Sequence, residues 1–471
     1  MGTDVCFPKR VFQKFKSFKF KDLFKHRPSC PFRKKPIEVQ PVEVDLPEKS
    51  VVAHFMMGLT STYQQSDFEW DINNAIIYGF DGFALNFGND DWMMDKLKLM
   101  YDAADAVNKD FKLYLMLDMA AMGSVSADVA TNYVKTFAKR SHQATIDGKI
   151  VVGTFSGESI NFGQSSVNDG WQTQFKDALA SAGINIFFIP CWSLDASTIY
   201  EKYTVADCFL KWNCWPYYSG SPMSDSEDQV YMQHAKGNKK KYMGAVSPCM
   251  FTHFSDKNFV FFSEGLWYTR WLQMIKLQPN YLQVVTWNDY GESHYIGPTN
   301  NNAAFPVSGS NSHEWVDQFT HVPLAGTLPY FIQMYKQGTT DLPSNFNGPS
   351  TLFFTYRIHS KNAKANGDSI GQPENYQNSK DEIDVIAFSK SSFSLKVSVN
   401  GTVLGTVNMQ AGVTSNSFSF VVNDKTVAGL PLFQIYEGSS EVSQATGPLS
   451  ILADDKVTQY NFNLCCGSLN W

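Results

Sequence analysis

The chain has 471 residues, of which 43% are hydrophobic and 15% aromatic, and its net charge is −6. This length exceeds one ordinary domain and predicts two, one of them large. The mild negative charge argues against nucleic acid as the main partner. No run of 18 apolar residues occurs, so no transmembrane segment is predicted.

Residues 1–49 differ from the rest of the chain in being rich in lysine and arginine. Phenylalanine and lysine alternate from Phe12 to Phe24, and no apolar core of a secretory signal follows. The segment predicts a basic, disordered leader and linker. Contact with acidic lipid or a targeting role are its alternatives. Without a signal peptide, we expect an intracellular, cytoplasmic protein.

The eight cysteines have neither the spacing of a disulfide framework nor that of a zinc site. Cys191, Cys208, Cys214 and Cys249 fall in or near apolar runs, where a buried free thiol is the usual state. We therefore expect no metal and no cofactor.

Between residues 50 and 340, short apolar runs alternate with amphipathic stretches. Such runs are typical of parallel strands, which are buried on both faces. Eight strands with crossovers predict an α/β fold, a (β/α)8 TIM barrel. An open doubly wound sheet is the alternative, but no glycine-rich phosphate loop follows the first run. We expect strands at Val51–Gly58, Gly82–Gly88, Lys112–Met119, Lys149–Phe155, Asn185–Cys191, Asp207–Asn213, Lys241–Cys249 and Tyr281–Trp287. We expect helices at Asp67–Tyr78, Trp92–Val107, Ala127–Ser141, Trp171–Ala182, Asp225–Lys236, Glu264–Leu277 and Gly326–Tyr335.

The pattern changes after a stretch rich in Pro, Gly, Asn and Ser at residues 339–350, where we place the domain boundary. Beyond it, short alternating runs predict a C-terminal all-β sandwich over residues 345–471. Asn400-Gly401, between two such runs, is a strong signal for a hairpin. The carboxylates of this region are scattered, so no chemistry is assigned to it.

Polar and aromatic residues gather at the ends of the barrel strands, whose loops share one face of the fold. The candidates in chain order are His54, Asn86, Asp90, Asp91, Asp118, Glu158, Trp192, Trp212, Asn213, Trp215, Tyr217, Trp287, Asn288, Asp289 and Glu292. Carboxylates beside Trp and Tyr rings suit glycoside hydrolysis. A sugar ring needs an apolar platform, with an acid and a base on opposite sides of the scissile bond. No Gly-x-Ser-x-Gly motif occurs, and the histidines are too dispersed to be metal ligands.

Several candidates have a structural alternative. Asp90 or Asp91 could cap the helix that begins near Trp92. His54 and Asp118 could be hydrogen-bonded core residues, and Glu158 could be an exposed loop acid. The tryptophans at 212 and 215 could belong to the core. These alternatives stay open at the level of the sequence.

The turn after the eighth strand is the strongest candidate. It holds Asp289 and Glu292 three residues apart, beside Trp287. On a straight strand two residues so spaced would face opposite sides. The segment must therefore turn for both acids to reach one cleft, and Gly291 would permit a sharp bend.

Four motifs together resemble glycoside hydrolase family 71, the fungal α-1,3-glucanases or mutanases. They are His54-Phe-Met-Met-Gly58, Asp81-Gly-Phe-Ala-Leu-Asn86 with Asp90-Asp-Trp92, Phe155-Ser-Gly-Glu158 and Thr286-Trp-Asn-Asp-Tyr-Gly-Glu-Ser293. The resemblance covers roughly residues 50–340. It implies endo-hydrolysis of α-1,3-glucan, a fungal wall polymer, with inversion and without a metal. It also implies Asp289 and Glu292 as the catalytic pair, assisted by Asp90 or Asp91.

From these observations we expect a monomeric endo-α-1,3-glucanase with Glu292 as the acid and Asp289 as the base, although the opposite assignment stays open. An inverting pair predicts carboxyl groups about 6.5–9.5 Å apart. Family members are typically secreted, whereas this chain has a basic leader. An intracellular member could act on the wall from inside or after release, as in spore release from an ascus. A glucanase of another linkage and a catalytically inert wall-polysaccharide binding protein are the alternatives.

Overall fold

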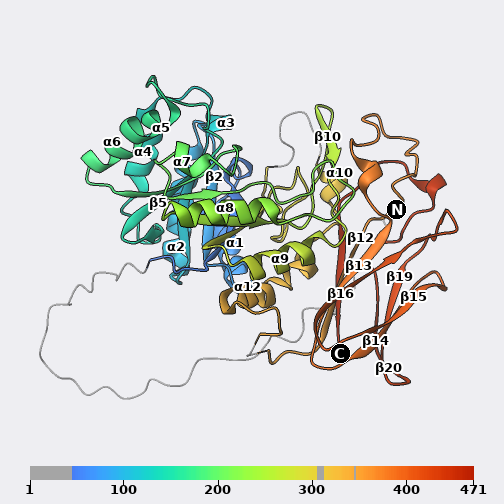
Figure 1. Cartoon of the computed structure of the whole chain (residues 1–471). Coiled ribbons are helices and arrows are strands. Elements are labelled where there is room, and N and C mark those ends of the chain that lie inside the picture. Colours follow the sequence, from blue (N-terminus) through green and yellow to red (C-terminus); the bar gives the residue numbers. More distant parts are fainter. Residues whose placement is uncertain (1–44, 305–311, 344–345) are drawn as a thin grey trace, which may run out of the picture. The chain divides into compact units, whose positions relative to one another are not determined.

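A computed structural model of the chain describes residues 45–304, 312–343 and 346–471. The basic leader predicted for residues 1–49 falls almost wholly outside these residues. The described part contains a curled, mainly parallel sheet with helices, followed by two antiparallel sheets (Figure 1). The fold is thus mixed α/β, as the sequence predicts.

All eight strands predicted for the first region are present, and they run parallel. They are β1 (Val51–Met56), β2 (Gly82–Phe87), β3 (Lys112–Asp118), β5 (Lys149–Phe155), β6 (Ile186–Cys191), β7 (Cys208–Leu210), β8 (Lys241–Val246) and β11 (Tyr281–Val284). Their order is β6-β5-β3-β2-β1-β11-β8-β7, and the short β4 (Thr145–Ile146) pairs antiparallel with β5. No ladder joins the two ends of this sheet in the described residues. At that point the Asp207 N–H, just before β7, donates to the Phe188 carbonyl of β6 at 3.0 Å.

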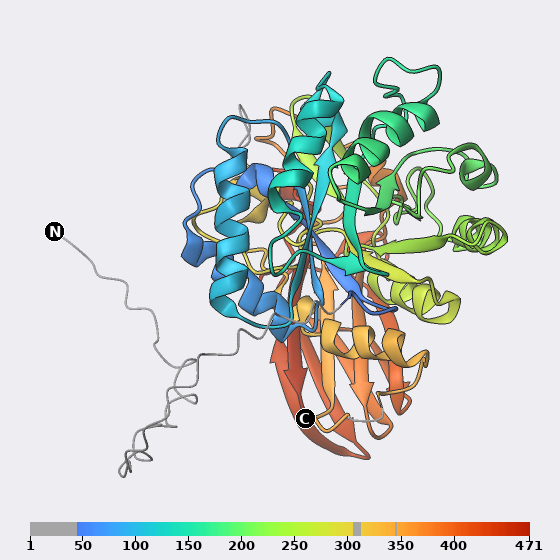
Figure 2. The same ribbon diagram turned by 90° about the vertical axis from the view of Figure 1, so that its left-hand side faces the viewer.

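The strands form these elements because their side chains are apolar on both faces. One core cluster collects inward residues from all eight strands, among them Val52, Tyr114, Phe187 and Met243. A second cluster lies between the strands and the helices, and it contains the neighbouring positions, such as Val51 and Ala53 of β1. The helices lie outside the strands (Figure 2). This two-sided burial is what near-continuous apolar runs require.

The main helices are α1 (Gln65–Ile77), α2 (Met93–Val107), α4 (Ala127–Phe137), α8 (Ser226–Gly237), α9 (Leu266–Leu277) and α12 (Leu328–Gln337). The shorter ones are α3 (Met119–Met122), α5 (Val167–Asp169), the π-helical turn η2 (Gly170–Lys176), α6 (Asp177–Ser181), α7 (Ile199–Lys202), α10 (His313–Val316) and α11 (Val322–Ala325). Helix α1 begins two residues earlier than predicted, because Gln64 and Asp67 form its capping box. Helix α2 has Trp92 as its N-cap without a side-chain hydrogen bond, so the alternative that Asp90 or Asp91 is the N-cap is wrong. No helix of the described residues is long and apolar enough to cross a membrane.

A hairpin that the sequence did not predict interrupts the region after β8. It consists of β9 (Phe251–Phe254) and β10 (Lys257–Val260), which pair antiparallel. The Phe251 N–H donates to the Glu292 carbonyl at 3.1 Å, so the hairpin rests against the loop that follows β11.

The C-terminal residues form two four-stranded antiparallel sheets. One has the order β16-β13-β12-β21 and the other β15-β14-β19-β20. The strands are β12 (Thr351–Tyr356), β13 (Glu382–Ser389), β14 (Phe393–Val399), β15 (Thr402–Met409), β16 (Gly412–Ser419), β19 (Pro431–Glu437), β20 (Ser440–Thr446) and β21 (Cys465–Asn470). Phe354 and Phe433 stack at 3.9 Å between the two sheets, within one shared core. The predicted turn at Asn400-Gly401 is confirmed, with positive φ at both residues as a tight hairpin requires.

Candidate active site

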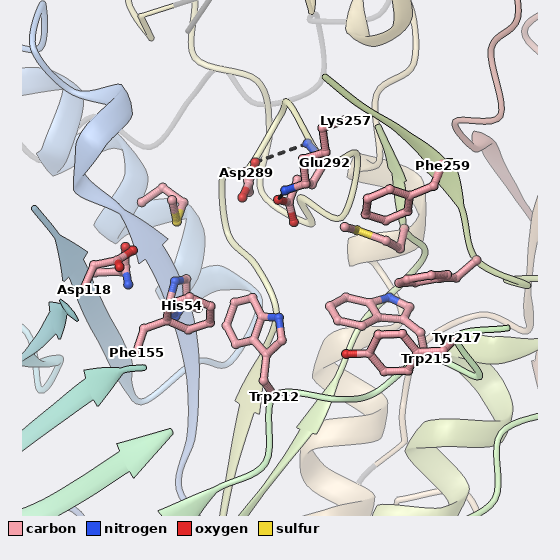
Figure 3. A pocket seen from close by; sticks show the side chains of 14 residues that line it. His54, Asp118, Phe155, Trp212, Trp215, Tyr217, Lys257, Phe259, Asp289 and Glu292 are labelled. Atoms are coloured by element: carbon pink, nitrogen blue, oxygen red, sulfur yellow. Dashed lines mark hydrogen bonds and ion pairs between the residues drawn. The ribbon is translucent and has the colours of Figure 1, made fainter. Parts of the chain in front are cut away.

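A cavity of about 300 Å3 opens at the carboxyl ends of the parallel strands. Figure 3 shows Asp118 and His54 on the left and Asp289, Glu292 and Lys257 at the top, with Trp212 below them and Phe259, Trp215 and Tyr217 on the right. The lining residues come from segments far apart in the sequence: His54, Met56, Asn86, Asp118, Phe155, Trp212, Trp215, Tyr217, Met250, Lys257, Phe259, Phe261, Asp289 and Glu292.

The loop after β11 turns sharply, as the sequence requires, and hydrogen bonds hold the turn. The Asp289 N–H donates to Thr286 Oγ1 at 2.8 Å, and the Glu292 N–H donates to Asp289 Oδ1 at 3.2 Å. Asn288 pins the loop to β1, because its Oδ1 accepts from the Met56 N–H at 2.7 Å. A Cβ on Gly291 would lie 2.9 Å from the Phe254 ring, so this glycine makes room for the hairpin. Both carboxyl groups consequently face the same cavity.

Glu292 is held by two cationic or donor groups. Lys257 Nζ of β10 donates to its Oε1, and His294 Nε2 lies 2.7 Å from its Oε2. Burial alone would raise the pKa of this carboxyl. The hydrogen bond and charge of His294, together with the Lys257 ammonium, outweigh burial and hold the pKa of Glu292 below its usual range.

The pKa of Asp289 shifts in the opposite direction, although this residue lies only three positions from Glu292. Burial and then the negative charge of Glu292 raise its pKa above the ordinary aspartate range. His294 Nε2 is 3.9 Å from its Oδ2, too far for a hydrogen bond. The pair therefore consists of one carboxyl that tends to keep its proton and one that tends to stay ionised.

The facing wall is formed by β1, β2 and β3. Asp118 caps α3, since its Oδ1 accepts from the Ala120 and Ala121 N–H groups at 3.1 and 3.0 Å. Burial raises its pKa, while those N–H groups and Asn86 act in the opposite direction. Burial lowers the pKa of His54 to about 3. His54 is therefore neutral, and its Nδ1 lies 3.2 Å from the Gln283 amide nitrogen.

Aromatic rings line the cavity between these walls. The Trp212 ring lies 4.9 Å from His54, 4.9 Å from Phe155 and 6.3 Å from Trp215. Tyr217 packs on Phe261 at 4.7 Å and donates its hydroxyl to Asn213 Oδ1. Such rings offer the apolar face on which a sugar ring can stack.

Eight of the candidates from the sequence line this cavity: His54, Asn86, Asp118, Trp212, Trp215, Tyr217, Asp289 and Glu292. Asn213 lines an adjacent hollow of about 320 Å3 that shares Trp215 and Tyr217. Asp90 and Asp91 are exposed and do not line the cavity. Glu158 is half-buried outside it, and its Oε2 is buried without a hydrogen-bond partner.

Two tryptophans and one asparagine that were expected to contact substrate are core residues instead. Trp287 is 0% exposed; it packs on Phe83 at 5.2 Å and donates its Nε1–H to Asp71 at 2.8 Å. Trp192 is buried against Trp171, at 6.1 Å. Asn288 is buried and holds the backbone of Met56. None of the three lines the cavity.

Several lining residues were missed by the sequence reasoning, chiefly Lys257 and Phe259 of the hairpin, with His294 behind Glu292. The hairpin had a signal, because Phe251–Phe254 and Lys257–Val260 flank the turn residues Ser255-Asp256. No sequence signal indicated His294, because its contact with Glu292 exists only in the folded chain.

Asp289, Glu292 and His294 bring three atoms of metal-ligand type within 4.8 Å of one another. Both Glu292 oxygens are already engaged by Lys257 and His294. A cation would have to displace the Lys257 ammonium, so the chemistry of this group suits a charged acid pair better than a metal centre.

Comparisons with known proteins identify the family of the chain. Residues 47–470 match glycosyl hydrolase family 71. The chain is 66% identical over 426 residues to the ascus wall endo-1,3-alpha-glucanase of Schizosaccharomyces pombe, which covers 90% of this chain and 98% of that relative. It is 38% identical to a glucan endo-1,3-alpha-glucosidase of the same yeast, over 90% of this chain and 95% of that relative. Among solved structures, a GH99 endo-alpha-mannosidase from Bacteroides thetaiotaomicron is similar, with 12% identity, a TM-score of 0.44 and coverage of 62% of this chain and 99% of that one. The chain therefore belongs to glycosyl hydrolase family 71.

Proposed function

We propose that this protein is an endo-hydrolase of α-1,3-glucosidic bonds in glucan. The observation that carries the proposal is the pair Asp289 and Glu292, held in opposite electrostatic environments at one aromatic cavity. Two carboxyl groups with separated proton affinities are what glycoside hydrolysis needs. The linkage is supported by the two yeast relatives, both of which are named as acting on α-1,3-glucan.

The electrostatics favour Asp289 as the general acid and Glu292 as the general base, which reverses our sequence-based assignment. The acid must hold a proton until the leaving oxygen takes it, and burial favours the protonated form of Asp289. The base must be ionised, and the cations around Glu292 favour that form. Asp118, Asn86 and neutral His54 on the facing wall would hold sugar hydroxyls, with Trp212 beneath the ring.

Inversion of the anomeric carbon is the part of the proposal most exposed to test. In this cluster one carboxylate oxygen of Asp289 lies within 4.8 Å of one carboxylate oxygen of Glu292. This separation is shorter than the expected gap of about 6.5–9.5 Å, although that range refers to whole carboxyl groups. Inversion therefore requires a water molecule to enter beside Glu292 when the sugar binds. A product that keeps the α configuration would instead make Glu292 a nucleophile.

We also propose that the eight parallel strands close into a (β/α)8 barrel over residues 50–340, with a β-sandwich over residues 345–471. Two observations support closure: the hydrogen bond from Asp207, the residue before β7, to Phe188 of β6, and the interior cluster drawn from all eight strands. The stacked Phe354 and Phe433 support the sandwich.

The biological setting is a further part of the proposal. We propose that the protein is a monomer that acts inside the cell, on wall α-glucan, during wall lysis such as the release of spores from an ascus. The name of the yeast relative supports the ascus wall as the substrate. Imaging of the tagged full chain in sporulating cells, and its elution volume in size-exclusion chromatography, test the location and the monomeric state.

One assay tests the activity against its alternatives. Purified protein is incubated with α-1,3-, α-1,4- and β-1,3-glucan, and the anomers released are followed by NMR. We expect products from α-1,3-glucan alone, formed first as the β-anomer. Cleavage of another glucan would identify a different linkage. Binding to α-1,3-glucan without any new reducing ends would identify a wall-binding protein.

A further inference from the structure

The hairpin that carries Lys257 is supported by the loop between β12 and β13, far along the chain. The Val260 N–H donates to the Glu374 carbonyl, and the Glu374 N–H donates to the Asn258 carbonyl, both at 3.0 Å. Phe259 and Glu374 form a parallel bridge. The loop thus adds a short extended segment alongside β10, on the edge opposite to β9.

A buried histidine ties both strands of the hairpin to this loop. His253 Nδ1 lies 2.8 Å from Asn258 Oδ1, and its Nε2 lies 2.8 Å from Asp368 Oδ2. The Asn258 amide nitrogen donates to the Gly371 carbonyl at 3.1 Å, which fixes the orientation of that amide. Each ring nitrogen thus faces a side-chain oxygen, one on β10 and one on the loop.

Asp368 is itself fixed by backbone groups from two places. Its Oδ1 accepts from the Ile370 and Gly371 N–H groups, both at 2.9 Å, which shapes the loop. Its Oδ2 accepts from the Tyr460 N–H at 2.8 Å, near the end of the chain. The side chain is 2% exposed, so these charge-assisted bonds are shielded from water.

We propose that Asp368, acting through His253 and the β9–β10 hairpin, is a positioning residue that holds the Lys257 ammonium against Glu292. Its importance for catalysis rests on the proposed function, in which Glu292 is the base. A lysine side chain is long and flexible, so its placement depends on how firmly its strand is held. Residues that orient a functional side chain from behind, through hydrogen bonds, are commonly nearly as important for function as that side chain itself.

The charged and titratable groups around Glu292 allow a selective test. Lys257 comes from the hairpin, whereas His294 and Asp289 come from the loop of Glu292 itself, and His54 comes from β1. The negative charge of Asp256, the preceding residue, also acts on Lys257. Loosening the hairpin therefore acts on Glu292 through Lys257, and also through the Phe251 N–H that donates to the Glu292 carbonyl. The Lys257→Met background separates these two routes.

The test uses Asp368→Asn and His253→Phe in the full chain. The first keeps an oxygen for Ile370 and Gly371 but turns an amide N–H toward His253. The second keeps a ring of similar size and loses both hydrogen bonds. The matched control is Asp381→Asn, because Asp381 ties the same loop through Arg357 and Ser360 without contacting the hairpin.

The readout is the titration of the Glu292 carboxyl by carbon-13 NMR of labelled glutamate, with Glu292→Gln to assign the signal. We expect its midpoint to rise by about one pH unit in both variants, as in Lys257→Met, and to stay unchanged in Asp381→Asn. In a Lys257→Met background, neither variant should move it further. An unmoved midpoint in both single variants, or a further rise in that background, overturns the proposal.

Glucan hydrolysis measured on the same samples separates the two proposals. If the midpoint moves but the wild-type chain cleaves no glucan, the positioning role stands and the proposed function fails. If hydrolysis is normal while the midpoint does not move, the positioning role alone is overturned.

Discussion

Lys257 donates to Glu292 across 35 residues of sequence, from a hairpin after β8 to the loop after β11. This contact, with that of His294, explains how two acids three residues apart acquire opposite tendencies. Asp289 is governed first by burial, whereas the cations around Glu292 overcome its burial. The division of labour between the acids is thus imposed by residues outside the motif that contains them.

Replacing Lys257 with methionine should move both limbs of the pH–rate profile to higher pH. The ammonium lowers the pKa of both Glu292 and Asp289, so its removal raises both. The base must be ionised, so the loss of activity on acidification begins at a higher pH. The acid must be protonated, so the loss on alkalinisation also begins at a higher pH. Profiles of kcat/KM against pH measure the positions of both limbs, with Lys257→Arg as the charge-preserving control. Limbs that move in opposite directions would contradict the prediction.

Asp289→Asn and Glu292→Gln should each lower the hydrolysis of α-1,3-glucan by about 10²–10⁴-fold. Circular dichroism should show unchanged folding, because the substitutions preserve shape. The two variants differ on α-glucosyl fluoride, whose leaving group needs no proton. Asp289→Asn should regain much of its activity there and Glu292→Gln should not. Recovery of activity in Glu292→Gln but not in Asp289→Asn would identify Glu292 as the acid.

Trp212→Ala should weaken substrate binding, whereas Trp287→Phe should weaken the fold. Trp212 lines the cavity, so losing its ring removes a stacking surface and should raise KM about tenfold or more for glucan oligosaccharides. Trp287 is buried and bonded to Asp71, so its replacement leaves Asp71 without that donor and costs about 1–3 kcal/mol of unfolding free energy. Initial rates and thermal melts of both variants test this prediction. A raised KM in Trp287→Phe with an unchanged melting temperature would show that Trp287 contacts the substrate.

The strands and the region of the site could be predicted from the sequence because they depend on local pattern. Continuous apolar runs identify all eight parallel strands, and the ends of parallel strands must meet at one face. Asn400-Gly401 was sufficient to predict the β14–β15 hairpin, because few dipeptides suit its tight turn. The closed barrel does not follow from these patterns alone.

Which residues face the cavity could not be predicted where the chain leaves regular structure. The regular alternation of inward-facing and outward-facing side chains ends with β11 at Val284. Nothing in the sequence therefore indicates whether Trp287 points inward or outward. Its partner Asp71 lies 216 residues away on α1. The same holds for Lys257, whose partner is set by tertiary folding. It also holds for Asp90 and Asp91, which are exposed and do not line the cavity.

Asp71 offers a test of stability that is independent of activity. It is fully buried, and burial raises its pKa to about 8, against the lowering effects of the Trp287 hydrogen bond and the nearby Tyr63 hydroxyl. Between the ordinary aspartate pKa of about 3.9 and this value, the folded chain binds a proton that the unfolded chain has lost. The stabilisation is complete below the unfolded pKa and is lost as pH rises through about 8.

Asp71→Asn should therefore flatten the fall in stability from pH 4 to pH 8, because an amide keeps the acceptor for Trp287 and cannot ionise. The gain at pH 8 should be on the order of a few kcal/mol, and at pH 4 the variant and the wild-type chain should melt alike. Urea unfolding at both pH values measures the difference, with the exposed Asp110→Asn as control. Equal slopes of stability against pH in Asp71→Asn and the wild-type chain would mean that Asp71 ionises normally in the core, and that Trp287 rests on a charged carboxylate.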